Sequence, residues 1–383
     1  MKRPTETNPS WPDVVAELHR LDGTVRARAA VLAAAPPGQD ALRGLVVSDS
    51  EFADLVTRRW SPPEGSAVAS SSAWGRLLVT LDLTSFEQDL LLLCLALELD
   101  RGYERIYAYL QDDITARQPT AGLALDLLCD TPRQRLSARR FFAAQAPLRA
   151  WRLIRLLPGR DNTSSLLGRP LALAPGVAAH LLDGDGLPSW ITRQAPDEST
   201  SSLDELPADV QATLSPLAEN AGARWWIHLL ADDEGEARQC ALALAGGWGM
   251  PLLTVSPTRL PSQPAALRRA ARDALLQGAT LYVPRPAVEA FPAQAWAEVV
   301  RDLPTPVLWG CPPVQARGAA TVPWPPTDDD AWRTSRVEIP DPSYERRRQL
   351  WERALGARRD ALDLDALAGR YRLSHDQIAQ AAR

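Results

Sequence analysis

Apolar positions repeat with a helical period along the first part of the chain. Between Trp11 and Ala35 they fall every three or four residues, and the pattern stops at Pro36-Pro37-Gly38, which predicts a long helix. A second helical pattern covers residues 49–60, and the small, polar, proline-containing stretch 62–72 is typical of a linker or mobile loop. We therefore expect residues 1–72 to form an N-terminal helical segment.

Residues 73–195 combine several helical patterns with brief extended segments. The densest apolar run is TSFEQDLLLLCLALEL, where Thr84-Ser85 and Glu87 offer an N-cap and an acidic first turn. Further helices are predicted over YERIYAYLQDD and LALDLLC, and GRPLALAPGVAAHLL reads as a short extended piece followed by a helix that begins at proline. This succession is compatible with a winged-helix-like domain.

The pattern changes after an acidic, serine-rich stretch at residues 196–208, which we expect to be an interdomain linker. The short apolar runs WWIHLLA, PLLTVS, ATLYVP and PVLWGC alternate with amphipathic helical stretches. Short strands alternating with helices indicate βαβ units around a parallel sheet. We expect residues 209–335 to form an α/β core of the P-loop NTPase-like kind and residues 336–383 to form a small helical lid.

The apolar run near residue 90 is too short to cross a bilayer. It spans about ten residues, roughly half of the transmembrane requirement, and Asp89 and Glu98 bracket it. The polar stretch from Met1 to Trp11 lacks the apolar region of a signal peptide. These features predict a cytoplasmic protein that does not associate with a membrane.

The cysteines, histidines and lysine limit the possible chemistry. The four cysteines and four histidines are scattered and show no ligand spacing, so we expect neither a metal site nor a disulfide framework. Lys2 is the only lysine. A catalytic or phosphate-binding lysine in the body of the chain is therefore excluded, and a self-contained hydrolase is disfavoured because neither G-x-S-x-G nor H-E-x-x-H occurs.

The site where a P-loop would bind phosphates has the wrong residues. The segment after WWIHLLA matches G-x-x-x-x-G-K-[ST] in position, but Asp232 replaces the first glycine, Ala237 the second, Arg238 the lysine and Gln239 the hydroxyl residue, while Gly235 is retained. Carboxylates at Asp232, Asp233, Glu234 and Glu236 would repel a nucleotide, since a like-charge pair at about 5 Å costs about 3 kcal/mol at an effective dielectric near 20. These residues predict a vestigial nucleotide loop.

Three further elements of a hydrolytic module are also replaced. The strand ATLYV is followed by Pro284-Arg285-Pro286 in place of the acidic pair that would hold magnesium and activate water. The strand PVLWG ends at Cys311-Pro312-Pro313 and not at a polar residue, and Ala379 stands where an arginine of the lid is common. We therefore expect no catalytic residue, no metal ligand and no bound cofactor in residues 1–383.

Arginines are concentrated in one stretch of the chain. Eight lie between Thr131 and Arg160, with no acidic residue among them, whereas eight acidic residues but only Arg101 and Arg105 lie between Asp82 and Asp113. The basic stretch predicts a surface for an acidic partner or nucleic acid, and the alternative is that both stretches are solvated helix faces. The candidate partner-binding residues are Arg133, Arg135, Arg139 and Arg140.

Several segments resemble a known family, the AAA+ ATPases associated with phage-tail-like extracellular contractile injection systems. They are LTSFEQDLLLLCLALELDRGYERIYAYLQDD, LALDLLC, PLRAWRLIRLL, GRPLALAPGVAAHLL, IPDPSYERRRQLWERALG and LAGRYRLSHDQIAQAAR. The resemblance implies a helical and winged-helix region, then a degenerate AAA+ module, and ATP and magnesium bound only by an intact second module beyond Arg383 if one follows.

The resemblance also implies a role and partners. We expect a non-hydrolysing region that acts in assembly, docking or remodelling of a contractile injection particle. Its partners would be AAA+ subunits of the same kind, in a homo-oligomer, and proteins of the particle. The alternative is a DNA-binding winged-helix regulator, which the net charge of −5 and the absence of a basic tail disfavour.

Overall fold

The computed structural model of the protein describes residues 11–33, 72–159, 165–183, 186–196, 202–312, 332–356 and 362–382. The chain divides into two compact units, residues 1–186 and residues 187–383. The helix expected over residues 49–60 and residues 62–71 of the expected linker lie outside the described residues. Each unit is described separately below.

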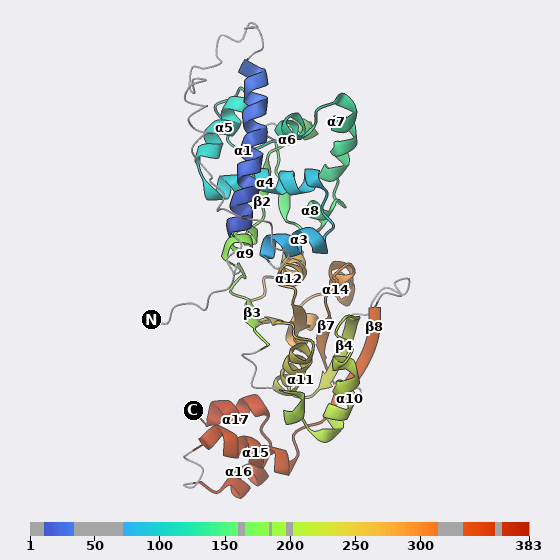
Figure 1. Ribbon diagram of the computed structural model, residues 1–383. Helices are drawn as coiled ribbons and strands as arrows, with labels where there is room; N and C mark the ends of the chain where they lie inside the picture. The colour runs from blue at the N-terminus through green and yellow to red at the C-terminus, as the bar shows by residue number, and fades with distance from the viewer. Residues whose placement is uncertain are drawn as a thin grey trace. The chain divides into compact units, whose positions relative to one another are not determined.

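The N-terminal unit consists mainly of helices (Figure 1). Its helices and short 3-10 turns are α1 (Trp11–Ala33), α3 (Ala73–Thr80), α4 (Ser85–Leu99), α5 (Gly102–Leu110), α6 (Ala121–Leu128), α7 (Pro132–Ala138), η1 (Arg139–Phe142), α8 (Pro147–Ala150), η2 (Leu166–Gly168) and α9 (Val177–Asp183). Its two strands, β1 (Ile154–Leu156) and β2 (Leu171–Leu173), pair antiparallel. The helices followed by a small hairpin agree with the winged-helix-like succession expected from the sequence.

Helix α4 is the central helix of this unit. The Thr84 hydroxyl accepts from the Glu87 amide at 3.4 Å, while the Glu87 carboxylate accepts from the Thr84 amide at 3.1 Å, which completes the expected capping box. All residues from Leu90 to Ala96 are buried. A helix that is apolar on every side is stable only when other elements surround it, so α4 forms the core of the unit.

Helix α1 belongs to the same unit as α4. It packs against α4, α6 and α9, and the Tyr103 hydroxyl donates a buried hydrogen bond of 2.6 Å to Asp22 Oδ1. The sequence pattern was expected to give a separate segment over residues 1–72. Within the described residues the first helix is instead part of the fold that follows it.

The C-terminal unit is built on a six-stranded sheet. Its strands are β3 (Ile191–Gln194), β4 (Arg224–Ala231), β5 (Leu252–Val255), β6 (Thr280–Val283), β7 (Val307–Cys311) and β8 (Trp332–Ile339), in the order β3-β5-β6-β7-β4-β8. All neighbouring strands are parallel except β3, which runs antiparallel to β5. The predicted parallel sheet is therefore confirmed, with an antiparallel strand added at one edge.

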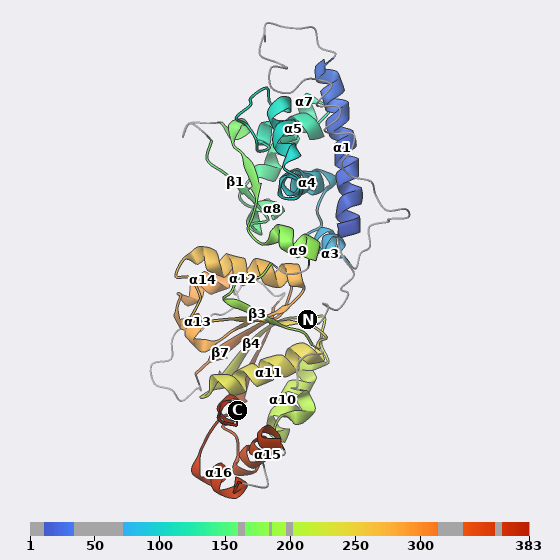
Figure 2. The same ribbon diagram turned by 90° about the vertical axis from the view of Figure 1, so that its left-hand side faces the viewer.

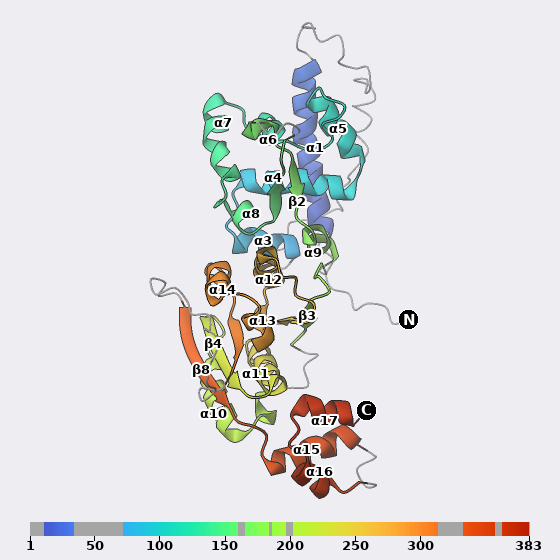
Figure 3. The same cartoon turned by 180° about the vertical axis from the view of Figure 1, so that it is seen from behind.

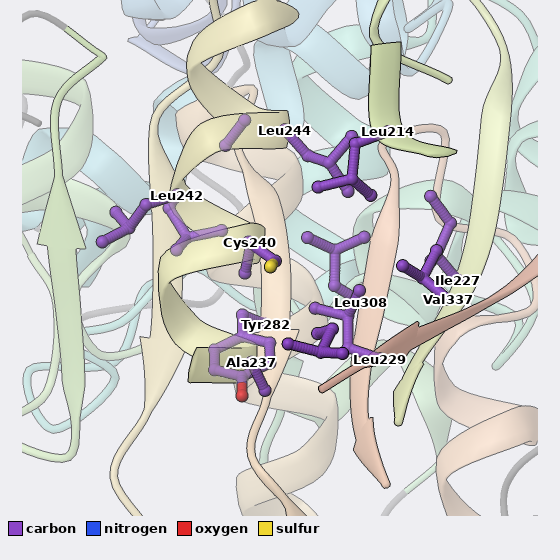
Figure 4. Packing of buried hydrophobic residues seen from close by; sticks show 14 of the residues in the cluster. Leu214, Ile227, Leu229, Ala237, Cys240, Leu242, Leu244, Tyr282, Leu308 and Val337 are labelled. Atoms are coloured by element: carbon purple, nitrogen blue, oxygen red, sulfur yellow. The ribbon is translucent and has the colours of Figure 1, made fainter. Parts of the chain in front are cut away.

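Helices cover both faces of the sheet (Figure 2). They are η3 (Leu203–Glu205), α10 (Ala208–Ala218) and α11 (Glu234–Gly247) on one face, and α12 (Pro264–Gln277), α13 (Arg285–Glu289) and α14 (Ala293–Val300) on the other. Helix α12 begins at Pro264 and ends before Gly278, whose φ of +55° is the left-handed conformation that closes a helix at little cost for glycine. Figure 4 shows Leu229, Cys240, Leu244 and Leu308 packed between α11 and the sheet.

Three features of this unit differ from the expected boundaries. Strand β8 crosses the boundary expected at residue 335. It pairs with β4 from Trp332 to Ile339, and its buried residues, Trp332, Val337 and Ile339, lie on both sides of that boundary. Strand β3 lies in the sheet although its residues were assigned to the preceding domain. Leu203 and Leu206, expected in the linker, pack against the core under α11.

The remaining helices form a small helical subdomain in the region where a lid was expected, and it is called the lid below. They are α15 (Tyr344–Leu355), α16 (Leu364–Arg370) and α17 (His375–Ala381), seen together at one end of the unit in Figure 3. Leu350, Trp351, Ala368 and Ile378 make a small separate core. Within the described helices, none combines the length and hydropathy needed to cross a bilayer.

Candidate functional site

The carboxyl ends of β4 and β7 mark the place where ligands bind in open parallel sheets. The chain leaves β4 toward β5 on one side of the sheet, and β8 lies on the other side of β4, so the strand order reverses at this point. Ligands in such sheets bind in the crevice outside the carboxyl ends of the strands at the reversal. The predicted vestigial loop follows β4 directly, and the segments after β6 and β7 meet it there.

The connection between β4 and α11 is shorter than the sequence comparison with a P-loop assumed. Only Asp232 and Asp233 lie between the strand and the helix, because α11 begins at Glu234. Gly235, Ala237, Arg238 and Gln239 were expected to replace P-loop residues in an eight-residue loop. They lie instead in the first two turns of α11, which corrects that expectation.

Asp233 occupies the amide groups at the beginning of α11. Its Oδ1 accepts hydrogen bonds from the Gly235 amide at 2.8 Å and from the Glu236 amide at 3.3 Å. Exposed amides at a helix N-terminus are what bind phosphate in P-loop proteins. Here a carboxylate of the chain itself satisfies two of them, as aspartate commonly does at an N-cap.

Glu234 fills the space beside the ends of β6 and β7. Its carboxylate accepts a hydrogen bond from the Tyr282 hydroxyl and another from the Arg285 amide, the latter at 3.1 Å. A Cβ atom added to Gly310 would lie 3.2 Å from both Glu234 carboxylate oxygens, so the carboxylate rests directly over this glycine. Tyr282 and Ala237 belong to the same buried cluster between α11 and the sheet (Figure 4).

Burial changes the protonation of the groups around this carboxylate. Loss of hydration raises the pKa of Glu234, although the hydrogen bonds from Tyr282 and the Arg285 amide oppose the rise. Burial, together with the neighbouring Glu234 charge, also raises the pKa of Tyr282 well above its usual range. Burial raises the pKa of Cys311 to about 12, so this thiol is not an activated nucleophile.

The remaining space is too small for a nucleotide. The cavity bounded by Asp232, Asp233, Glu234, Arg285 and Cys311 has a volume of about 50 Å³. Pockets that enclose small organic ligands have volumes of roughly 300–1,000 Å³. This enclosed space has room for little more than water, whereas the open cleft beside it, which shares Asp232 and Asp233, has a volume of about 330 Å³.

Pro284 and Arg285 follow β6, at the positions where a hydrolytic module has two acidic residues. Pro284 is the N-cap of α13 and Arg285 its first residue, and the Arg285 guanidinium lies 3.8 Å from Glu289. Tyr282 and Glu234 were not singled out from the sequence as a pair. The signal available was a single tyrosine inside the otherwise aliphatic strand ATLYV.

A second, larger cleft lies between the loop after β4 and the lid. It has a volume of about 330 Å³, with Asp232, Asp233 and Asp341 on one side and Arg347 and Arg372 from the lid on the other. From the sequence, an arginine of the lid was considered only at the position of Ala379, and Arg347 and Arg372 were not singled out. Arg347 is engaged locally, since its Nε donates to the Ala368 carbonyl at 3.0 Å.

The four candidate partner-binding arginines lie together on α7 and η1. Arg133, Arg139 and Arg140 are exposed, whereas Arg135 is half-buried and paired with Asp126. Within the described ranges, no group of three or more histidine, cysteine, aspartate and glutamate side chains is arranged to hold a metal ion.

Comparison with known protein families gives two matches on separate parts of the chain. A winged helix domain, in a variant form, matches residues 73–193. A contractile injection system ATPase helical domain matches residues 343–383, which contain the lid. Among curated proteins, none matches this sequence.

One solved structure that is similar to the chain is described as "Structural Basis for Katanin Self-Assembly". The identity is 18%, the alignment covers 49% of this chain and 71% of that chain, and the TM-score is 0.33. At this score the likeness carries no argument about function.

Proposed function

We propose that the C-terminal unit is a degenerate AAA+ module whose nucleotide site is occupied by the carboxylates of the chain itself. In this proposal the chain acts without hydrolysing ATP, in the assembly, docking or remodelling of a contractile injection particle. Hydrolysis would come from an intact AAA+ module elsewhere, where ATP and magnesium bind.

The topology and the family matches support the AAA+ assignment. AAA+ modules place the first strand of the parallel sheet between the fourth and the fifth, as β4 lies between β7 and β8 here. A small helical lid follows the last strand, and the family model that matches it is that of a contractile injection system ATPase. The winged-helix match in the preceding unit agrees with the order of domains that the resemblance implies.

The observation that carries the proposal is the pair of carboxylates at the head of α11. Asp233 takes the Gly235 and Glu236 amides, and Glu234 takes the Tyr282 hydroxyl and the Arg285 amide. A phosphate would have to displace both side chains from these donors and then lie among other acids. With Lys2 as the only lysine, no ammonium group from the body of the chain offsets that repulsion.

Two measurements on the full chain test this. Calorimetric titration with ATPγS and magnesium should show no affinity tighter than about 100 μM, which corresponds to about 5.5 kcal/mol, and phosphate release from ATP should not exceed the rate in buffer. The double variant Asp233→Asn, Glu234→Gln removes two charges and keeps both shapes. We expect it to bind no better, because Asp232 and Asp341 still line the neighbouring cleft and the body of the chain has no lysine.

The matched control is Arg238→Ala. If nucleotide did bind through the P-loop position, this variant would weaken the binding, whereas a chain without a nucleotide site gives the same titration with and without Arg238. Turnover of ATP by the purified chain, or an ATP analogue seen with ordered phosphates against Gly235 and Arg238, would refute the proposal.

A DNA-binding regulator is the second candidate, and the winged-helix match at residues 73–193 is the observation that favours it. Winged helices often read DNA, and phosphate contacts by arginine would make such binding strongly salt-dependent. Binding of duplex DNA that weakens steeply with salt and is abolished by replacing Arg133, Arg135, Arg139 and Arg140 with alanine would favour this function. The net charge of −5 argues against it.

A further inference from the structure

Two exposed apolar side chains of the N-terminal unit have charged neighbours in the sequence, basic for one and acidic for the other. Leu136 on α7 is 73% exposed and Ile114, in the loop after α5, is 59% exposed. A single exposed apolar side chain is ordinary in a soluble protein. The charged residues nearest to them in the sequence, however, have opposite signs: Leu136 lies between Arg133 and Arg139, and Ile114 directly follows Asp112 and Asp113.

The first surface, which we term the α7 basic face, consists of Arg133, Leu136, Arg139 and Arg140. Positions 133, 136 and 140 follow a helical spacing, so they lie on one face of α7 and its continuation η1. The three arginines are exposed, and none forms an ion pair within the described part of the chain. Helix α7 itself lies on the side of the unit opposite to α5 (Figures 1 and 3).

Contacts of η1 hold the backbone of the α7 basic face in place. The Arg140 guanidinium lies 4.9 Å from the centre of the Phe141 ring, and Phe141 stacks on Phe86 at 4.9 Å between ring centres. Arg149 reinforces this position by donating to the Phe142 carbonyl at 2.5 Å. The guanidinium groups are thus presented from an ordered turn, which lowers the entropy lost when a partner binds.

The second surface, which we term the acidic loop, consists of Asp112, Asp113, Ile114 and Thr115. Asp112 has a φ of +52°, a left-handed conformation that aspartate tolerates better than most residues. Asp113 Oδ1 accepts from the Thr115 amide at 2.8 Å and so fixes the turn. The loop presents an isoleucine next to two carboxylates.

We infer that the α7 basic face binds the acidic loop of a second copy of this chain. Both surfaces of the complementary pair are present on one unit. One has a leucine between arginines, and the other has an isoleucine next to two aspartates. Nucleic acid would match the arginines but not Leu136, and it would be repelled by a chain of net charge −5. This inference concerns the N-terminal unit and does not depend on the state of the nucleotide site.

The contact is small, so its strength should depend on repetition and on salt. Stable interfaces bury about 1,200–2,000 Å² in total, which a pair of four-residue surfaces does not reach alone. Association should therefore be weak in a single pair and should fall as salt screens the exposed charges. Two identical contacts in a dimer, or repeated contacts in a ring, would add to the affinity.

Sedimentation velocity on the full chain tests the inference. At ~50 mM salt we expect reversible self-association that is lost at ~500 mM salt. Replacement of Arg139 and Arg140 by glutamate should weaken the association at least about tenfold, because acidic side chains would then face the acidic loop. Leu136→Ser should weaken it several-fold without any change in net charge.

A charge exchange between two variants gives the sharpest result. The Arg139→Glu, Arg140→Glu variant and the Asp112→Arg variant should each associate poorly alone, yet a mixture of the two should associate about as well as the native chain. The basic loop of one then faces the acidic α7 face of the other, and the native contact forms in the reverse direction. The positive φ at position 112 disfavours arginine, so a second variant at this position is needed. Asp112→Asn removes the negative charge and keeps a residue that tolerates this φ, and it should weaken association more mildly than Asp112→Arg.

The matched control changes the same net charge elsewhere. Arg26 and Arg268 are exposed and lie outside both surfaces, so the Arg26→Glu, Arg268→Glu variant should associate like the native chain. Circular dichroism melting confirms that each variant is folded. The inference is wrong if the native chain stays monomeric at low salt, if the control weakens association equally, or if the mixture does not restore it.

Binding to duplex DNA is measured in parallel by fluorescence anisotropy. If the arginine replacements abolish DNA binding while self-association of the native chain is absent, the α7 basic face is a nucleic-acid surface and the inference is overturned. We expect these variants to leave the ATPγS titration unchanged. The test of the proposed function and the test of this inference therefore give independent results.

Discussion

The carboxylates at the head of α11 and the α7 basic face use their charges in opposite ways. Asp233 and Glu234 turn toward amide and hydroxyl donors of the chain itself, and the space left beside them is about 50 Å³. Arg133, Arg139 and Arg140 extend outward without an ion pair in the described part of the chain. Charge is dense in both regions, but Asp233 and Glu234 are held by donors of their own chain, whereas the three arginines are exposed.

This difference shows that a count of charges along the sequence does not identify a binding surface. A charged group that is satisfied inside the fold would have to break its hydrogen bonds before it could bind a ligand, and a buried donor left without a partner costs about 1–3 kcal/mol. An exposed arginine has only water to lose. The predictions below test the comparison, starting with the largest expected effect.

Replacing Gly310 should disturb the closed site most. A Cβ atom at this position would lie 2.7 Å from the Arg285 amide nitrogen and 3.2 Å from the Glu234 carboxylate oxygens, so either α13 or Glu234 must move. We expect Gly310→Ala to lower the free energy of unfolding by about 1–3 kcal/mol, measured by urea unfolding. Gly222→Ala, where nothing lies within 4 Å, is the control and should have little effect.

Removing the cap of α11 should have a somewhat smaller effect. Asp233→Ala leaves the Gly235 and Glu236 amides without their carboxylate, and the loss of an N-cap costs about 1 kcal/mol. Thr84→Ala at the start of α4 is the matched comparison in the N-terminal unit. Equal stability of the native chain and Asp233→Ala would mean that the head of α11 is not held closed by this side chain.

The pH dependence of stability should report Glu234, with an effect confined to one pH window. Because burial raises the pKa of Glu234 in the folded chain, the folded state keeps a proton that the unfolded chain has released. The contribution of this group is fully present below the unfolded pKa, about 4.3, and is lost as pH rises through the folded value. Unfolding at a series of pH values should show that Glu234→Gln lacks this loss.

The ion pair of α7 should contribute least. Arg135 and Asp126 are each 37% exposed at the side chain, and exposed pairs contribute about 0.2–1 kcal/mol. Arg135→Ala should therefore lower the melting temperature slightly, while Arg139→Ala should leave it unchanged. A larger loss for Arg139→Ala would show that the α7 basic face stabilises the fold and is not reserved for a partner.

The sequence pattern was sufficient to predict the elements whose residues are buried on both sides. Strands β4 and β7 read as continuous apolar runs, and the helical stretches predicted between the strands correspond to helices α11, α12 and α14. Strand β8 was missed because it lies at the sheet edge, where Arg333, Arg336 and Glu338 interrupt its apolar residues. An edge strand with one exposed face has no continuous apolar run to detect.

The residues predicted to form a vestigial nucleotide loop lie at the carboxyl end of β4, but most of them are in helix α11 and not in a loop. The acids after β4 could be counted from the sequence. The length of the connection could not, because helix α11 begins at Glu234, inside the stretch that was aligned with a P-loop. The contact between Glu234 and Tyr282 joins residues 48 positions apart, and only the packing of α11 on the sheet brings them together.

Strand β3 has a consequence for any attempt to study the two units separately. The first three of its residues, Ile191–Gln194, fall at the end of the stretch matched by the winged-helix model, yet the strand pairs with β5 in the sheet. A fragment that starts at residue 196 would leave the backbone groups of β5 unpaired at a bare sheet edge, which invites strand-to-strand aggregation. Dissection before residue 187 keeps this edge covered, so a soluble C-terminal piece must carry a few residues that sequence matching attributes to its neighbour.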